Sequence, residues 1–336
     1  MHQIPPAYRT KTNTITALAL LCLITSPFIG MTFIAPTALF STTQPLDHTI
    51  LIHLRIPRTI TAFLTGASLG LCGLVFQSIF RNPLATPYTL GVSSGAALGA
   101  TLSITLGIPL IIVGLPALMP IAVVSAVLTM LFVYTIASLK QQTSNTILLL
   151  AGVSVNLLCA SLILFTQFIS NERNINRILR WLMGSISSTD YVSTISIACI
   201  ALPVFWLIYR HRNELDLLLN GDDIAQTRGV DIVRTKRTLY FSASILTGVL
   251  VAFCGPIGFV GIITPHIARR LFSVRHTTNI IPVACLGGIL LTVCDTIART
   301  VFAPAELPVG IITSMLGGPF FLYILLKHNN TYQGDL

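Results

Sequence analysis

Residues 55–100 read RIPRTITAFLTGASLGLCGLVFQSIFRNPLATPYTLGVSSGAALGA. A first apolar run opens after a pair of arginines, Arg55 and Arg58, and closes at Arg81, which a proline follows two positions later. A second run, rich in Gly, Ser and Ala, starts at once. This pattern predicts a tight hairpin of two membrane helices, because small residues four positions apart let helix backbones approach closely in lipid. The small-residue pairs are Gly66/Gly70 and Gly95/Gly99.

Composition places this hairpin in a membrane protein. The chain has 336 residues, of which 53% are apolar and 9% charged, and its mean hydropathy is +0.82; a soluble domain carries about 25% charged residues. Long unbroken apolar runs favour spanning helices over a closed β-barrel. The net charge of +9 would suggest a nucleic-acid partner for a soluble protein. Here basic loops that fix the topology explain it, so we expect membrane lipid and no nucleic acid.

The apolar runs predict an all-α polytopic membrane protein with one transmembrane domain over residues 1–336. The first run is longer than the apolar region of a signal peptide, which favours an uncleaved helix. We expect residues 41–54 to form an outside loop and residues 170–190 an amphipathic surface helix. The eighth helix is short for a membrane core of about 30 Å, so a partly re-entrant segment is an alternative there. The ten expected spans are about 15–40, 57–80, 88–106, 117–139, 147–168, 192–209, 239–254, a short span ending at 269, 280–301 and 306–327.

The distribution of charge orients these helices. Ten spans put both termini on one side of the membrane. If that side is the cytoplasm, most of the 20 Lys and Arg residues lie inside, as the positive-inside rule requires. We therefore expect a multi-pass protein of the cell (inner) membrane with both termini cytoplasmic. The basic residues left outside are Arg55, Arg58, Arg173, Arg177, Arg180 and Arg299.

A weak internal echo suggests a repeat. Thr65-Gly66 precedes Cys72-Gly73 at the same spacing at which Thr247-Gly248 precedes Cys254-Gly255. The two helices that carry these copies run in opposite directions in the predicted topology. An inverted repeat of helices 2–5 and 7–10 would explain the echo, as in many transporters; chance is the alternative.

The longest polar segment, residues 210–237, is the best candidate for a partner site. Its centre, Asn220-Gly-Asp-Asp-Ile-Ala-Gln-Thr-Arg-Gly229, predicts two short helices that meet at a glycine turn. A helix–turn–helix wedge on the cytoplasmic face can fit a groove on another subunit. The alternative is a solvated loop in which Asp222 and Asp223 cap a helix.

Several motifs in register resemble the permease subunit of binding-protein-dependent ABC importers for iron–siderophore complexes, haem and cobalamin, the FecCD type. The resemblance covers about residues 55–327. The chain departs from the residues that are usual in this family at Thr264 and Cys294, and both departures are small. The motifs are Arg55-Ile-Pro-Arg58, Gln77 before Arg81-Asn-Pro-Leu-Ala85, Leu90-Gly-Val-Ser-Ser-Gly-Ala96, Leu148-Leu-Leu-Ala-Gly152, Arg180-Trp-Leu-Met-Gly184, Gly255-Pro-Ile-Gly-Phe-Val-Gly261, Asp295 with Arg299, and Glu306-Leu-Pro-Val-Gly310.

The resemblance assigns roles that the residues alone leave open. It implies an ATPase-coupling site at Leu217, Asp222, Asp223, Ala225, Arg228 and Gly229. It implies that Arg55, Arg58 and Arg299 dock a periplasmic or lipid-anchored binding protein, where interfacial snorkelling is the alternative. It implies a cytoplasmic gate at Thr143, Ser144, Asn145 and Thr146, where a helix cap is the alternative. It implies a pathway between two permease copies, or this chain and a paralogue, whose wall includes Gly152, Ser154, Asn156, Thr313 and Ser314; helix packing is the alternative for the glycine.

The chain therefore reads as a transport subunit and not as an enzyme. It has no Gly-x-x-x-x-Gly-Lys-[Ser/Thr] phosphate loop, so we expect ATP and Mg²⁺ on two separate ATPase subunits, and neither a catalytic residue nor a cofactor in this chain. Its seven cysteines lack Cys-x-x-Cys spacing, which gives no reason to infer a metal site or disulfides. One rival is an ion-coupled secondary transporter, for which Asp295 would be the intramembrane acid. A membrane-embedded enzyme is the other, but the sequence shows no cluster of acids or histidines for it.

Overall fold

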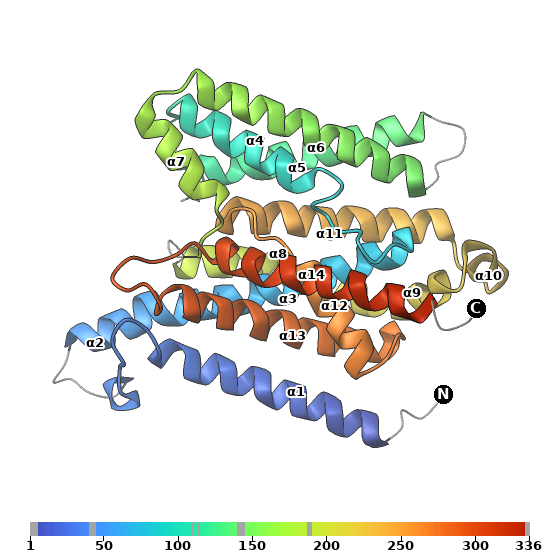
Figure 1. The fold of residues 1–336 in the computed structure, drawn as a ribbon, viewed down its shortest axis with the longest axis horizontal. Coiled ribbons are helices and arrows are strands. Elements are labelled where there is room, and N and C mark those ends of the chain that lie inside the picture. Colours follow the sequence, from blue (N-terminus) through green and yellow to red (C-terminus); the bar gives the residue numbers. More distant parts are fainter. Residues whose placement is uncertain are drawn as a thin grey trace.

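A computed structural model describes residues 6–39, 45–108, 111–112, 115–139, 145–186 and 190–332. Most of its long helices lie roughly along one direction (Figure 1). The only strands among the described residues are β1 (Ile111–Ile112) and β2 (Leu115–Pro116), which pair antiparallel. The helices are α1 (Pro6–Thr25), α2 (Pro45–Ile50), α3 (Ile56–Phe80), α4 (Val92–Thr105), α5 (Leu118–Ser138), α6 (Asn145–Phe168), α7 (Glu172–Leu182), α8 (Tyr191–Arg210), α9 (Arg212–Leu219), α10 (Asp222–Thr227), α11 (Ile232–Cys254), α12 (Val260–Leu271), α13 (His276–Ala298) and α14 (Val309–Tyr332).

The ten expected spans correspond to ten of these helices. Six stretches are long and apolar enough to cross a membrane within the described residues, and they include α3, α5, α6, α8, α11 and α13. The other four are α1, the shorter α4 and α12, and α14. The amphipathic surface helix is α7, whose Asn171 accepts a hydrogen bond from the Asn174 amide and so caps its start.

The first helix is shorter than expected. It ends at Thr25, and a 3₁₀ turn at Ser26–Phe28 follows it, so the prediction of a helix to residue 40 is wrong. Pro27 lacks a backbone donor and restricts the residue before it, which ends regular helix there. The apolar residues beyond pack locally instead: Ile34 is buried against Leu51.

The expected outside loop at residues 41–54 is also partly wrong. Within it, α2 continues through a π-helical turn, Leu51–Arg55, directly into α3. Pro57 has no amide hydrogen and its ring crowds the preceding turn, and a wider turn before it accommodates both effects. The result places Arg55 in the π turn itself.

Two inverted halves cross at α3 and α11. The hydroxyl oxygen of Thr65 on α3 lies 3.6 Å from the sulfur of Cys254 on α11. Reciprocally, Cys72 on α3 and Thr247 on α11 both donate to the Ala243 carbonyl of α11, at 3.4 Å and 2.8 Å. The four residues of the sequence echo therefore meet in two exchanged pairs, which is the arrangement that a two-fold axis between α3 and α11 produces.

The helices that pack against α3 and against α11 also correspond to each other between the two halves. α3 packs against α12 and α13, and α11 packs against α4 and α5. Equivalent glycines lie at two of these contacts. A Cβ on Gly66 would lie 2.1 Å from the Gly287 carbonyl oxygen of α13, and a Cβ on Gly248 would lie 2.7 Å from the Cβ of Ala126 on α5. The contact pattern supports the predicted inverted repeat of α3–α6 and α11–α14.

The second helix of each half is short. α4 has 14 residues and α12 has 12, so at 1.5 Å per residue neither spans a core of about 30 Å. The loops that precede α4 and α12 cover the remaining thickness of the membrane core. The two loops also contact each other, because the Ile257 amide donates a hydrogen bond to the Tyr88 hydroxyl at 2.7 Å. Irregular backbone at membrane depth is tolerated where protein covers it.

The glycine contact between α3 and α13 gives the first prediction. We expect Gly66→Ala to push the two helices apart and to destabilise the protein by about 1–3 kcal/mol, the usual range for overpacking. Thermal unfolding of the detergent-solubilised protein measures this. Gly318→Ala on α14 is the matched control, because a Cβ there meets nothing within 4 Å and alanine favours helix. Equal loss of stability in both variants would contradict the packing argument.

Candidate functional site

Two groups of predicted site residues lie at opposite ends of the long helices. α1 begins and α14 ends at the same end of the molecule at which α9 and α10 lie (Figure 1). We call this the coupling end. The predicted docking arginines lie at the other end, where α13 finishes and α3 begins, and we call it the outer end.

The coupling end carries the predicted helix–turn–helix wedge. α9 and α10 meet at Gly221, whose φ is +122°, and Gly229 follows α10 with φ +84°. Both values lie in a region that L-residues rarely adopt, so glycine is needed at both turns. The wedge has a buried side and an exposed side. Ala225 is fully buried with Leu215 and Leu218, and Leu217 is half-buried, whereas Asp223, Ile224, Arg228 and Gly229 are exposed.

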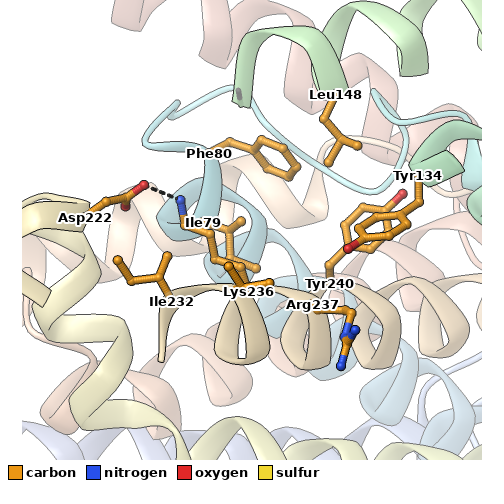
Figure 2. A pocket seen from close by; sticks show the side chains of 10 residues that line it. Ile79, Phe80, Tyr134, Leu148, Asp222, Ile232, Lys236, Arg237 and Tyr240 are labelled. Carbon is orange, nitrogen blue, oxygen red and sulfur yellow. Dashed lines mark hydrogen bonds and ion pairs between the residues drawn. The ribbon is translucent and has the colours of Figure 1, made fainter. Parts of the chain in front are cut away.

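Asp222 ties α10 to two spanning helices. One carboxylate oxygen lies 2.6 Å from Arg81 Nη2 at the end of α3, and the other lies 2.7 Å from Lys236 Nζ on α11 (Figure 2). Burial raises the pKa of the Asp222 carboxyl, but Lys236 and then Arg81 outweigh burial and hold the pKa below its usual range. The carboxylate therefore stays ionised at neutral pH. Arg81 reaches it from a left-handed backbone conformation, φ +48°, that ends α3.

Asp216 makes the second link, to α13. Its carboxylate accepts hydrogen bonds from the backbone amides of His276 and Thr277, the first residues of α13, and lies 3.0 Å from His276 Nδ1. The other ring nitrogen of the buried His276 lies 2.5 Å from the Ser78 hydroxyl of α3. Burial raises the pKa of the Asp216 carboxyl, and the bonds from His276 and Thr277 lower it further than burial raises it.

At the outer end, Arg58 is paired within the chain. Its guanidinium donates to both carboxylate oxygens of Asp295 at 2.9–3.1 Å, and its Nη1 donates to Glu306 at 2.8 Å. The Arg58 side chain is 11% exposed and Asp295 2%, whereas Glu306 is 47% exposed. The main partner of Asp295 is therefore Arg58. Arg299, one helical turn after Asp295, lies farther away, with its Nε 3.8 Å from an Asp295 carboxylate oxygen.

The other two predicted docking arginines hold the segment after α1. Arg299 is 5% exposed and donates from Nη2 to the carbonyl and the hydroxyl of Ser26, both at 2.8 Å. Arg55 is half-buried and donates to the carbonyls of Pro27, Phe28 and Thr32. In this structure both side chains are engaged by backbone of the same chain.

The predicted pathway residues divide between packing and exposed surface. Gly152 is a packing glycine, since its Cβ would lie 2.6 Å from Leu90 Cα, and the buried Thr313 donates to the Gly310 carbonyl. Ser154 on α6 and Ser314 on α14 are exposed, and Asn156 is half-buried. Of the predicted gate, Thr143 and Ser144 lie outside the described residues. Asn145 begins α6, and Thr146 after it is exposed.

Sequence reasoning missed the links at the coupling end. Arg81 is part of the motif Arg81–Ala85, but nothing in the sequence connects it with Asp222. The charge distribution places Lys236 only among the inside charges, and no motif indicates a role for Asp216 or His276. These partners are 14 to 141 positions apart in the chain, and only the fold brings them together.

Comparison with known proteins gives the chain a family context. The model of the FecCD transport family matches residues 18–327. The hemin transport system permease protein HmuU of Yersinia pestis is 36% identical over 308 residues, which are 88% of each chain. The cobalamin import system permease protein BtuC of Halobacterium salinarum is 38% identical over 273 residues, 81% of this chain and 72% of that protein. A solved inward-facing structure of a metal-chelate type ABC transporter superposes with a TM-score of 0.85 at 29% identity, over 95% of this chain and 99% of that one.

The buried ion pair at the outer end gives the second prediction. Asp295→Asn leaves Arg58 and Arg299 without their buried counter-charge, so we expect a loss of about 3–5 kcal/mol in unfolding free energy. Glu306→Gln removes a bond to a largely exposed carboxylate and should cost less than about 1 kcal/mol. Chemical or thermal unfolding of the purified protein measures both. A mild effect of Asp295→Asn would show that the pair contributes little to folding.

Proposed function

The chain belongs to the FecCD transport family, and we propose that it is the permease through which an ABC importer carries an iron complex, haem or cobalamin. It is an all-helical, multi-pass membrane protein, and permeases of this family work with ATPase and binding-protein partners. The likeness to the hemin permease over 88% of both chains carries the proposal. The relatives are named for hemin, cobalamin and a metal chelate, which supports a large metal chelate as substrate.

We infer that separate ATPase subunits, two per transporter, bind the wedge of α9 and α10. The exposed Asp223, Ile224 and Arg228 offer a mixed charged and apolar contact surface. A displacement of the wedge would be transmitted to the spanning helices through two side chains. Asp222 connects the wedge to α3 and α11, and Asp216 connects it to α13. Closure of an ATPase against the wedge would then move three spanning helices together.

The substrate pathway in this proposal lies between two permease copies, or between this chain and a paralogue. Of the long apolar helices, α5 and α6 are the least buried within the chain. Only 28% of an 18-residue apolar stretch in each is buried, against 78% in the segment that includes α3. Ser154 and Ser314 put hydroxyls on exposed faces of α6 and α14, where a second chain could complete a polar wall. The proposed gate is residues 143–146, of which the described Asn145 and Thr146 begin α6.

The orientation completes the proposal. The wedge, the start of α1 and the end of α14 share one end of the molecule (Figure 1), so an ATPase in the cytoplasm requires both termini to be cytoplasmic, in the inner membrane. The outer end then faces the binding protein, which would dock at Arg55, Arg58 and Arg299. Because Asp295 holds one edge of Arg58, an acidic side chain of the binding protein would reach Nη1 by replacing Glu306.

The rival of an ion-coupled secondary transporter is disfavoured by the same geometry. Such a carrier needs an intramembrane acid that can release its partner to take up a proton or sodium ion. Asp295 is buried and accepts three hydrogen bonds from Arg58. A carboxylate held this way is already occupied by a cationic side chain.

Gly229 gives a test of coupling. Gly229→Pro cannot adopt φ +84° and removes the amide that donates to the Gln226 carbonyl at 2.9 Å. We expect at least about a tenfold loss of ATP-dependent uptake, equivalent to roughly 1.4 kcal/mol, with the protein still folded. The assay is uptake and ATP hydrolysis in proteoliposomes that contain the permease with its ATPase and binding-protein partners.

A second glycine provides the matched control for that assay. Gly107 also has positive φ and open space around its Cβ, but it follows α4, away from the wedge. Gly107→Pro should leave the ratio of substrate transported to ATP hydrolysed unchanged. Uptake without the ATPase, driven by a proton or sodium gradient, would revive the secondary-transporter rival; unimpaired coupling in Gly229→Pro would remove the wedge from the mechanism.

Glu306 gives a test of docking. If the carboxylate of Glu306 competes with one on the binding protein for Arg58 Nη1, Glu306→Gln should tighten binding-protein affinity by about threefold to tenfold, because neutral partners bind a guanidinium less strongly. Surface plasmon resonance with the permease in nanodiscs measures this. Arg58→Gln should weaken binding, and weaker binding in Glu306→Gln would instead make Glu306 itself a docking residue.

A further inference from the structure

One face of α8 is exposed and largely apolar along its whole length. A set of exposed residues recurs there at alternating steps of three and four positions, which places them on one side of the helix. They are Val192, Ile195, Cys199, Leu202, Trp206 and Tyr209. The opposite side of α8 packs against α3 and α11, whereas the proposed pathway uses faces of α6 and α14. We call the exposed set the α8 stripe; its apolar length suits lipid hydrocarbon, and its aromatic end is typical of the interface with water.

Two arginines lie at the coupling end of the α8 stripe, on either side of the joint between α8 and α9. Arg210 is the last residue of α8, and its Cζ lies 5.7 Å from the centre of the Trp206 ring. Arg212 is the first residue of α9, and its Cζ lies 4.2 Å from the centre of the Tyr209 ring. Cations within about 6 Å of an aromatic face are attracted to it. Because both rings belong to the stripe, both guanidiniums are held on its side of the helix.

The hydrogen-bonding edges of these two guanidiniums are unused. Neither Arg210 nor Arg212 forms a hydrogen bond or an ion pair with any residue that the structure describes. By contrast, Arg58 and Arg81 are paired with carboxylates. An aromatic ring engages the face of a guanidinium and leaves its planar fork of N–H groups free for a bidentate contact with an oxyanion. The joint therefore presents two free forks and two positive charges where the apolar stripe ends.

We propose that the joint between α8 and α9 binds the headgroup of an anionic phospholipid of the inner leaflet. The phosphate contacts Arg210 and Arg212, and an acyl chain packs along Trp206 and Leu202. A phospholipid joins phosphate to hydrocarbon in the order in which the joint and the stripe present their contact surfaces. Free phosphate has no part that could cover the stripe. The choice of leaflet rests on the orientation in the proposed function; binding itself does not.

The charge of the joint favours anionic over zwitterionic lipid. Two guanidiniums without a carboxylate leave a local excess of positive charge. Phosphatidylcholine would bring a quaternary ammonium beside them, whereas phosphatidylglycerol brings a phosphate and hydroxyls. Each basic residue near a membrane surface contributes about a fivefold preference for anionic lipid.

The joint is also the root of the coupling wedge. Arg212 begins α9, and the same short helix carries Asp216, which holds the start of α13. A headgroup bound at Arg212 therefore restrains the end of the wedge that adjoins the membrane. The anionic lipid content would then alter the coupling of ATP hydrolysis to uptake without any contact with the substrate.

Quenching of Trp206 fluorescence tests the proposal on the permease alone. The chain has two tryptophans, so Trp181→Phe leaves Trp206 as the only one that emits. The full chain would be reconstituted in dioleoyl phosphatidylcholine vesicles with increasing fractions of phosphatidylglycerol that is brominated on its acyl chains. We expect more quenching than random mixing of the two lipids produces. The preference should fall about fivefold in Arg212→Gln, which keeps the contact between Arg210 and Trp206, and further in Arg210→Gln/Arg212→Gln.

Arg234→Gln/Arg237→Gln is the matched control, because both arginines are exposed near the start of α11, at the same end of the molecule. It removes the same charge but should leave the lipid preference at Trp206 unchanged, and unfolding temperatures should show that all variants fold. Quenching at the level of random mixing in the unsubstituted joint would overturn the proposal. An equal loss of preference in the control and in the joint variants would also overturn it, since the net charge of the molecule would then be the cause.

Two further results would assign these arginines to another ligand. If inorganic phosphate abolishes the lipid preference and chloride at equal ionic strength does not, the ligand is free phosphate. If Arg210→Gln/Arg212→Gln keeps the lipid preference but binds the ATPase more weakly, the arginines form a protein contact. Either result overturns the lipid assignment. The quenching measurement needs no transport partner, so its outcome is independent of whether Gly229→Pro uncouples transport.

Discussion

The close approach of α3 and α13 is the contact on which the rest of this structure depends. At their middle, Gly66 and Gly287 leave no room for a side chain on either helix. At the outer end the same two helices are joined by Arg58 and Asp295, and at the coupling end by Ser78 and His276. Neither polar pair could form if a side chain at the middle held the helices apart. In lipid, where burial of apolar surface does not draw helices together, a glycine contact that permits such pairs is the effective source of association.

This seam also explains how distant ends of the molecule are connected. The His276 ring belongs both to the α3–α13 seam and to the contact with Asp216 on α9. A displacement of α9 is therefore applied to the start of α13, and the end of α13 carries Asp295 and Arg299 at the outer end. The chain of contacts is continuous from the wedge to the segment after α1 that Arg299 and Arg55 hold.

Hydropathy and small-residue spacing were sufficient to predict the class of fold, most helix positions and the two-helix wedge. The Thr65/Cys72 and Thr247/Cys254 echo indicated the inverted repeat, which the contacts between α3 and α11 support. The prediction failed where apolar composition was followed past Pro27, and where the polar composition of residues 41–54 hid a helix that Pro57 enters through a wide turn. The partners of Asp222 and Arg58 could not be predicted, since a charge gives no indication of which distant opposite charge the fold will bring to it.

The two glycine approaches that relate the halves are unequal, and this has a mechanical consequence. Gly66 meets another glycine, so α3 and α13 touch backbone to backbone, whereas Gly248 meets Ala126 and a methyl group separates α11 from α5. The α3–α13 seam is moreover fastened by polar pairs at both ends. The side of the molecule at the α3–α13 seam is thus built as a stiff frame. The side where α11 meets α5, with α6 at its edge, is the compliant one, so that a load applied at the wedge deforms the molecule there first.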